Sequence, residues 1–174
     1  MTFSIRKTIR AIVSPKHRLS CSTELWREGL AELRRRGLHG RRESGAFLLG
    51  ECNGERRQVV RLAYYDDLDP HSLDTGIVVF DGAGYGPLWQ QCRDEGLTVV
   101  ADVHTHPGRP WQSNSDRTSP MIAKRGHIAL IVPKFAERAF MPGEIGIYEY
   151  QGEHRWRDLS GPRAGQTFYI GYWG

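Results

Sequence analysis

The sequence predicts an α/β (α+β) fold in which a mixed central β-sheet is flanked by helices. Three observations support this prediction. Apolar runs of strand length recur along the chain, two segments between them have the periodicity of amphipathic helices, and an Asn-Gly pair separates two of the runs. Because the 174 residues contain no linker or repeat, we expect one domain over residues 1–174.

The composition excludes several classes of protein. The 24 Lys and Arg residues against 20 Asp and Glu give a net charge of +4, which is too small for the concentrated basic stripe of a nucleic-acid-binding protein. The longest aliphatic run, 128–132, has the length of a strand and cannot span a membrane. The first 13 residues lack the apolar core of a signal peptide. We therefore expect a cytoplasmic protein with neither membrane nor nucleic acid as a partner.

The cysteines carry little functional signal. Cys21, Cys52 and Cys92 are far apart and form no CxxC pair. An odd number of separated cysteines indicates reduced, partly buried thiols rather than a disulfide framework or a cysteine-based zinc site.

Two longer helices are expected, besides the short one described below. The first covers residues 22–36, where apolar residues repeat every three to four positions, Ser22 or Thr23 provides the N-cap and Gly37 the C-cap. We interpret the arginines of its last turn as a solvated helix end that the helix dipole favours. The second runs from about Pro87 to Glu95 and is closed by a glycine.

The strands are predicted from short apolar runs and turn signals. Residues 43–50 and 58–65 are expected to form a β-hairpin around the turn at Asn53-Gly54. Further strands are expected at 76–80, 97–106 and 127–133, with a last hairpin of 145–150 and 155–159.

The remaining segments are less regular. Residues 66–76 are acidic and rich in turn residues, which indicates a loop, and 119–126 are expected to form a short helix. Residues 3–13 fit either an edge strand or an extended arm. The sequence assigns no definite structure to the N-terminal arm, 1–20, or to the glycine-rich aromatic tail, 161–174.

The strongest functional signal is a pair of histidines near the end of an apolar run. His104 and His106 are two residues apart, so their side chains point to the same face if the run is a strand. Asp116 follows after a short loop, and two imidazoles with one carboxylate make a three-ligand metal site with a fourth position open. The alternative is a chance His-x-His pair on a solvated turn, because short motifs produce false positives.

Hydrolysis at such a metal needs two further groups. A carboxylate must accept the proton of the attacking water, and a donor must stabilise the oxyanion of the tetrahedral intermediate. Ser113 lies in the same loop and can serve as the donor. No general base lies in this stretch, so it must come from elsewhere in the chain.

Four motif elements in order resemble the JAB/MPN metalloproteases, whose JAMM motif has a Glu on an early strand, then HxHP, then Ser-x-x-Asp. Residues 43–50 resemble the family's Glu segment, 104–107 its histidine pair, and 113–116 its Ser-x-x-Asp. The resemblance covers roughly residues 22–150. It implies an MPN/cytidine-deaminase-like architecture and one catalytic Zn²⁺.

The resemblance also implies a role for each matched residue. His104, His106 and Asp116 would bind zinc, Glu43 would be the general acid/base, and Ser113 would bond the developing oxyanion. Six residues separate His106 from Ser113 where the family usually has seven. This departure concerns the position of the serine rather than the ligands, and it leaves Ser115 as a second candidate for the oxyanion contact.

Members of this family hydrolyse the amide bond after the C-terminus of ubiquitin-like proteins. The compact chain lacks the long insertions of eukaryotic members and resembles the prokaryotic stand-alone type, which is often encoded beside activating and conjugating enzymes, including in anti-phage operons. The resemblance therefore implies a protease or isopeptidase that removes a bacterial ubiquitin-like protein, with a flexible C-terminal tail, from targets or from its precursor. Sulfur-carrier processing is an alternative within the enzyme class. A non-catalytic MPN scaffold and a nucleic-acid-associated JAB-like protein are alternatives from other classes.

Four nearby residues each have an ordinary and a functional interpretation. Asp102 shares a face with His104 and either bonds an imidazole or points to solvent. His127 and His71 are expected to be ordinary polar residues. Trp111, in the ligand loop, either walls a substrate groove or packs on its own turn.

Overall fold

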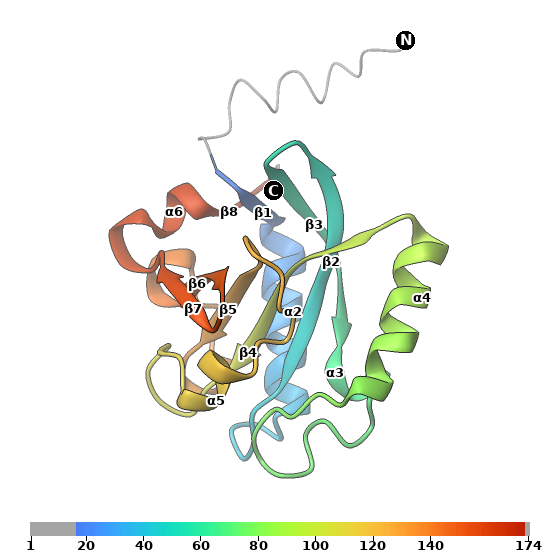
Figure 1. Ribbon diagram of the computed structural model, residues 1–174. Coiled ribbons are helices and arrows are strands. Elements are labelled where there is room, and N and C mark those ends of the chain that lie inside the picture. The colour runs from blue at the N-terminus through green and yellow to red at the C-terminus, as the bar shows by residue number, and fades with distance from the viewer. Residues whose placement is uncertain (1–16, 173–174) are drawn as a thin grey trace.

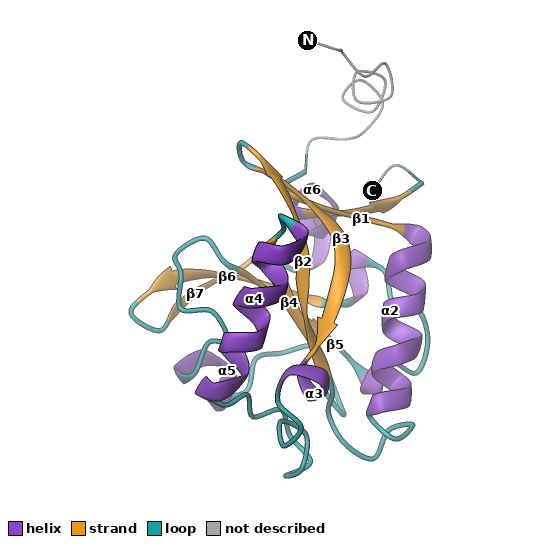
Figure 2. Cartoon of the chain, turned by 90° about the vertical axis from the view of Figure 1, so that its right-hand side faces the viewer, coloured by secondary structure: helices purple, strands orange, loops and turns teal. Residues whose placement is uncertain are grey.

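The computed structural model describes residues 17–172, which form one mixed sheet with helices on both faces (Figures 1 and 2). The strands are β1 (Leu19–Ser22), β2 (Gly45–Asn53), β3 (Arg56–Tyr64), β4 (Thr98–Thr105), β5 (Ile128–Val132), β6 (Gly146–Gly152), β7 (Arg155–Asp158) and β8 (Phe168–Gly171). They lie in the order β7-β6-β5-β4-β2-β3-β1-β8. The β4–β5, β1–β3 and β1–β8 pairs are parallel and the others antiparallel. The predicted mixed α/β class is confirmed.

The helices bury apolar side chains against the two faces of the sheet. They are α2 (Thr23–Arg36), α3 (Tyr65–Leu68), α4 (Tyr85–Glu95), α5 (Asn114–Thr118) and α6 (Ala164–Thr167), with 3-10 turns η1 (Gly82–Gly84), η2 (Lys134–Ala136), η3 (Pro142–Glu144) and η4 (Gly161–Arg163). Trp26, Leu30 and Leu33 of α2 belong to the larger core on one face. Leu88 and Cys92 of α4 belong to a smaller core on the other. The central strands are therefore covered on both sides, which explains their continuous apolar runs.

Both long helices begin and end close to the residues that the sequence predicts. The Ser22 hydroxyl caps α2 by accepting a hydrogen bond from the Leu25 amide at 3.1 Å. Helix α4 ends at Gly96, whose φ of +66° is the left-handed conformation that glycine adopts without strain.

The arginine-rich end of α2 is solvated as predicted at Arg34 and Arg35, which are exposed, but not at Arg36. The Arg36 guanidinium bonds Asp66 at 2.6 Å and Asp67 at 2.8 Å, and it also contacts Glu32 one turn earlier. Only 13% of the Arg36 side chain is exposed. Arg36 therefore joins α2 to α3, because the acidic residues that the sequence assigns to a loop form that helical turn.

The predicted hairpin is confirmed as β2 and β3. A bulge at Leu49/Gly50 interrupts its register. A Cβ on Gly50 would lie 1.9 Å from the Gln58 carbonyl oxygen, so the close approach of the two strands requires glycine there.

Residues 76–80 do not form the predicted strand. The segment bends at residues 76 and 77, and it joins no sheet. The Val79 amide donates to the Ser72 carbonyl, and the Val78 amide donates to the Glu43 carboxylate. These bonds to a loop and to a side chain take the place of a strand ladder.

Residues 119–126 do not form the predicted helix, because helix α5 begins earlier and ends at Thr118. Ser113 caps the true start, and Ser119 has a φ of −129° and a ψ of 69°. A residue before proline disfavours the helical conformation, which is why the helix does not continue into Pro120.

The first and last strands of the described residues lie side by side at one edge of the sheet. Strand β8, from the tail that the sequence left unassigned, pairs in parallel with β1. The predicted arm or edge strand at 3–13 lies outside the described residues. All three cysteines are free, as expected, with Cys21 and Cys92 buried and Cys52 exposed. Within residues 17–172, no helix has both the length and the apolar character needed to cross a bilayer.

Candidate metal centre

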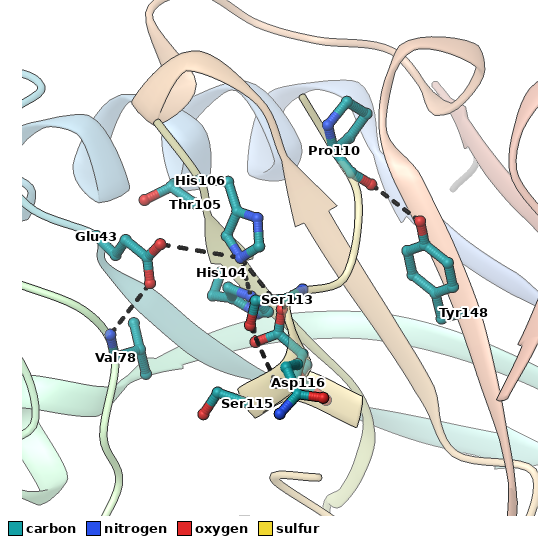
Figure 3. A network of polar contacts seen from close by, with 12 residues as sticks. Glu43, Val78, His104, Thr105, His106, Pro110, Ser113, Ser115, Asp116 and Tyr148 are labelled. Atoms are coloured by element: carbon teal, nitrogen blue, oxygen red, sulfur yellow. Dashed lines mark hydrogen bonds and ion pairs between the residues drawn. The ribbon is translucent and has the colours of Figure 1, made fainter. Parts of the chain in front are cut away.

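Strand β4 brings the two histidines to one point. His104 lies between Gly45 of β2 and Ile131 of β5 in the register of the sheet. His106 follows the last residue of β4, and its amide continues the parallel pairing by donating to the Val132 carbonyl at 2.9 Å. The extended backbone therefore holds through His106, and the two Nε2 atoms lie 3.0 Å apart (Figure 3).

Gly45 allows β2 to lie this close to the histidine strand. A Cβ on this residue would lie 2.3 Å from the Tyr65 ring and 2.9 Å from the Val103 carbonyl oxygen. Such distances are far inside van der Waals contact, so any side chain would displace β2 or Tyr65. Packing therefore explains the glycine two residues after the predicted general base.

Asp116 reaches the histidines from the first turn of α5. A capping box fixes this turn: the Ser113 hydroxyl accepts from the Asp116 amide at 3.2 Å, and the Asp116 carboxylate accepts from the Ser113 amide at 2.6 Å. The same carboxylate lies 3.3 Å from Nε2 of His104 through Oδ1 and 3.3 Å from Nε2 of His106 through Oδ2. The Asp116 carboxylate therefore both caps helix α5 and faces the two histidines. We call His104, His106 and Asp116 the metal triangle.

These distances fit a bound metal ion. Ligand atoms at about 2.0–2.1 Å from a tetrahedral metal lie roughly 3.3 Å from one another. The two Nε2 atoms of His104 and His106 are 3.0 Å apart, and each lies 3.3 Å from a different carboxylate oxygen of Asp116; one ligand atom from each residue lies within 4.8 Å of the other two. Among the described residues they are the one group of three or more such side chains that converges closely enough to hold a metal. Two imidazoles and a carboxylate suit several first-row divalent ions.

The Asp116 carboxylate and the two histidines shift each other's pKa values. Burial alone would raise the pKa of the Asp116 carboxyl, but hydrogen bonds from His104 and His106 outweigh burial and hold that pKa well below its usual range. Burial has the opposite effect on His104, whose pKa it would lower. The hydrogen bond and the charge of Asp116 outweigh burial and raise the pKa of His104 above its ordinary value of 6.5. A proton therefore competes with a metal for this centre.

Glu43 lies beside the triangle and outside it. Its Oε1 is 3.9 Å from Nε2 of His106, and its Oε2 accepts from the Val78 amide at 3.2 Å (Figure 3). The Glu43 amide donates to Gly76 at 2.9 Å. The segment 76–80 therefore orients this carboxylate, a contact for which the sequence offers no signal beyond an apolar run.

The shortened ligand loop is tied to the sheet at Pro110. The Tyr148 hydroxyl of β6 donates to the Pro110 carbonyl at 3.2 Å (Figure 3). A Cβ on Gly146 would lie 2.1 Å from the same oxygen, so only glycine allows the loop to approach β6. A loop of six residues therefore still delivers Ser113 and Asp116 to the histidines, and the sequence does not reveal either anchor.

The serines of this loop differ in what they contact. Ser113 uses its oxygen as the cap of α5, which leaves its hydroxyl proton available to a further acceptor. Ser115 is exposed, and its backbone carbonyl accepts the Ser119 amide. Trp111 is 61% exposed, and the guanidinium of Arg109 in the same loop lies 4.8 Å from its ring.

Asp102 and His127 form a buried pair. Nε2 of His127 lies 2.6 Å from Oδ1 of Asp102, and each residue is at most 5% exposed. As expected, His127 belongs to no group of possible metal ligands among the described residues, but the parallel pairing of β4 with β5 brings it to Asp102. His71, in contrast, is exposed, and its imidazole bonds Asp74 of the same loop at 2.8 Å.

Comparisons with known proteins agree with this geometry at a coarse level. No model of a known protein family matches the chain. Over 64 residues it is 31% identical to the probable metalloprotease y4jG of Sinorhizobium fredii, a match that covers 37% of this chain and 40% of that protein. The chain thus spans less than half the length of this relative.

Two solved structures have folds similar to that of this chain. A protein of Desulfitobacterium hafniense aligns over 87% of this chain and 92% of its own, with a TM-score of 0.60 and 17% identity. A protein of Salinibacter ruber aligns over 79% and 91%, with a TM-score of 0.50 and 18% identity. At such identities the likeness shows the fold alone. Together, the comparisons make this chain a distant homologue of a probable metalloprotease, with a His-His-Asp group that fits a metal ion.

Proposed function

We propose that this protein is a zinc metalloprotease of the JAB/MPN type, which hydrolyses the amide bond after the C-terminus of a ubiquitin-like protein. The observation that carries the proposal is the convergence of His104, His106 and Asp116 on one point with the carboxylate of Glu43 beside it. Three ligands with an adjacent carboxylate that is not a ligand are typical of hydrolytic rather than structural sites.

His104, His106 and Asp116 would hold the ion. When bound there, Zn²⁺ would lower the pKa of a water and polarise the scissile carbonyl. The chain's own residues then supply the proton chemistry and the orientation of the substrate.

Glu43 is the proposed general acid/base. Its Oε2 is held by the Val78 amide, while Oε1 faces the metal triangle at 3.9 Å from His106. A carboxylate held through one oxygen can accept the proton of the attacking water on the other. It can then deliver that proton to the leaving amine, which departs as a neutral group.

Ser113 is the proposed oxyanion donor. Because its oxygen is fixed by the Asp116 amide, the hydroxyl proton can be directed at a developing negative charge. The same capping box orients the ligand Asp116, so donor and ligand keep a constant relation to each other.

The segment 76–80 is the proposed binding surface for the substrate's extended C-terminal tail. It lies against Glu43 through Val78, and the side chains of Ile77 and Val79 on either side are about half exposed. An extended apolar surface beside the reacting groups suits a flexible C-terminal tail, which would bind in the manner of an added strand. The partner proposed here is thus a ubiquitin-like protein, either conjugated to a target or within its precursor.

The test uses purified, zinc-loaded protein. Its substrate is a ubiquitin-like protein encoded near its gene, supplied as the precursor or as a conjugate. We expect one zinc per chain and cleavage after the C-terminal residue of the ubiquitin-like protein. Glu43→Gln should keep the zinc and lower turnover by about 10²–10⁴-fold, because it removes proton transfer and leaves the ligands intact. Glu51→Gln, at the exposed far end of β2, the strand that follows Glu43, is the matched control and should retain full activity.

The outcomes separate the parts of the proposal. A wild-type protein that binds no zinc refutes the metal centre. Zinc binding without cleavage of any conjugate or precursor refutes the protease activity, and cleavage of a sulfur-carrier precursor alone changes the substrate. Full activity of Glu43→Gln would contradict the assigned acid/base.

A further inference from the structure

A small cavity lies beside the metal triangle. Its volume is about 20 Å³, and its polar lining includes Asp102, His104, Gln112 and Asp116. A cavity must offer roughly 10–15 Å³ to the centre of a water-sized probe to hold one water molecule. This cavity therefore has room for one water and is too small for a substrate side chain.

Two polar atoms of its lining residues lack a protein partner. Nδ1 of His104 and Nε2 of Gln112 are buried without a hydrogen bond. Leaving a buried donor unpaired costs about 1–3 kcal/mol, so such groups are normally satisfied by protein or by ordered water. For a histidine that binds metal through Nε2, the other nitrogen carries a hydrogen and almost always donates it.

Asp102 is the acceptor on the same face. It lies two residues before His104 on β4, and its carboxylate accepts from His127 at 2.6 Å and from the Tyr65 hydroxyl at 3.4 Å. An ionised carboxylate has about four acceptor positions. Those two bonds hold the group in place and leave it capacity for another donor.

We propose that one water in this cavity links the metal ligand His104 to the buried Asp102–His127 pair, with Gln112 as its third partner. The water accepts from Nδ1–H of His104 and Nε2–H of Gln112, and it donates to Asp102. Three bonds are the usual number for a buried water. Asp102 and Gln112 are then positioning residues, which act on the metal through His104. This inference rests on the metal centre of the proposed function but not on its substrate.

The test measures the zinc dissociation constant by chelator competition. Asp102→Asn keeps the shape of the side chain but weakens the acceptor, and Gln112→Met keeps the length but removes the donor. We expect each to weaken zinc binding by about 10-fold or more, since partners of metal ligands typically contribute 10–100-fold. Ile131→Val is the matched control, because Ile131 lines the same cavity but its side chain has no polar atoms. This variant should keep the zinc dissociation constant within about twofold of the wild type.

The double variant Asp102→Asn/Gln112→Met distinguishes a shared water from two separate effects. If both residues act through one water, the double variant should bind zinc about as weakly as the weaker single variant. Additive losses would overturn the shared water. Unchanged zinc affinity in both single variants, with only their thermal stability lowered, would show a purely structural pair. Wild-type protein that binds zinc while these variants bind it equally well refutes this inference alone, whereas wild-type protein without zinc refutes the proposed function.

Discussion

At the residue scale, the two histidines are held differently. His104 is buried, and its backbone lies inside β4 between β2 and β5. His106 lies beyond the strand end and is fixed by its backbone, which donates to Val132 and accepts from Phe135. The His106 side chain therefore does not hold the backbone in place, and we expect that it can be removed without disturbing the chain around it.

His106→Ala should abolish stoichiometric zinc binding while the protein stays folded. Only two ligands would remain, and the backbone bonds that hold this position do not involve the side chain. Metal analysis after dialysis gives the zinc content, and circular dichroism checks the fold. His71→Ala, an exposed histidine that contacts Asp74, serves as the control and should bind one zinc per chain. Full zinc occupancy in His106→Ala would rule out this residue as a ligand.

Zinc affinity should fall as the pH is lowered, beginning above pH 6.5. Asp116 raises the pKa of His104 above its ordinary value of 6.5, and the imidazole must lose its proton to bind a metal. The proton therefore competes more strongly as the pH falls through this raised pKa. Dissociation constants at pH 8, 7 and 6 measure the effect, and equal values over that range would contradict it.

At the element scale, one five-residue helix does most to shape the site. Helix α5 is too short to be stable by itself, so its capping box and the ties of the preceding loop to β6 define where Asp116 lies. The sequence motif Ser-x-x-Asp thus describes a helix start as well as a part of the proposed catalytic site.

Two helix caps offer a matched comparison. Ser22→Ala and Ser113→Ala each remove a side chain that accepts an amide bond at a helix start. We expect Ser22→Ala to lower the free energy of unfolding by about 1 kcal/mol with turnover unchanged. Ser113→Ala should lower turnover by about 10²-fold or more, because it also removes the proposed oxyanion donor. Denaturant titration and initial rates measure both; equal, small effects on turnover would refute the donor role.

At the scale of the whole molecule, the sheet builds the metal triangle in advance. The pairing of β4 with β2 and β5 orients the histidines, and the capping box orients Asp116, so no bond in this arrangement requires the ion itself. Such a centre should bind metal without folding around it.

Metal removal should leave a folded but less stable protein. At a free zinc concentration of 100 times the dissociation constant, binding stabilises the native state by about 2.7 kcal/mol. For a chain of this size, that corresponds to a rise in Tm of about 5–10 °C. Calorimetry with and without a chelator measures the shift, Glu43→Gln should show the same shift, and His106→Ala should show none. Loss of the folded signal on chelation would mean that the ion is structural.

The sequence alone predicted the elements whose signals are local. Helix 23–36, the hairpin around Asn53-Gly54 and the strand before His106 follow from periodicity, caps and turn residues, which act within a few positions of the chain. The same local signals misassigned 76–80 and 119–126. Apolar content does not reveal whether a backbone finds a strand partner, and the capping box lies upstream of the proline.

Which side chains meet was decided by tertiary structure. The sequence could name Glu43, His104, His106, Asp116 and Ser113, but residues 43 and 104 come together only because β2 pairs with β4. The Asp102–His127 pair and the contacts of Val78 and Pro110 required the sheet order and the loops packed against it. Contacts between distant residues depend on the register of whole strands, and no short window of sequence contains that information.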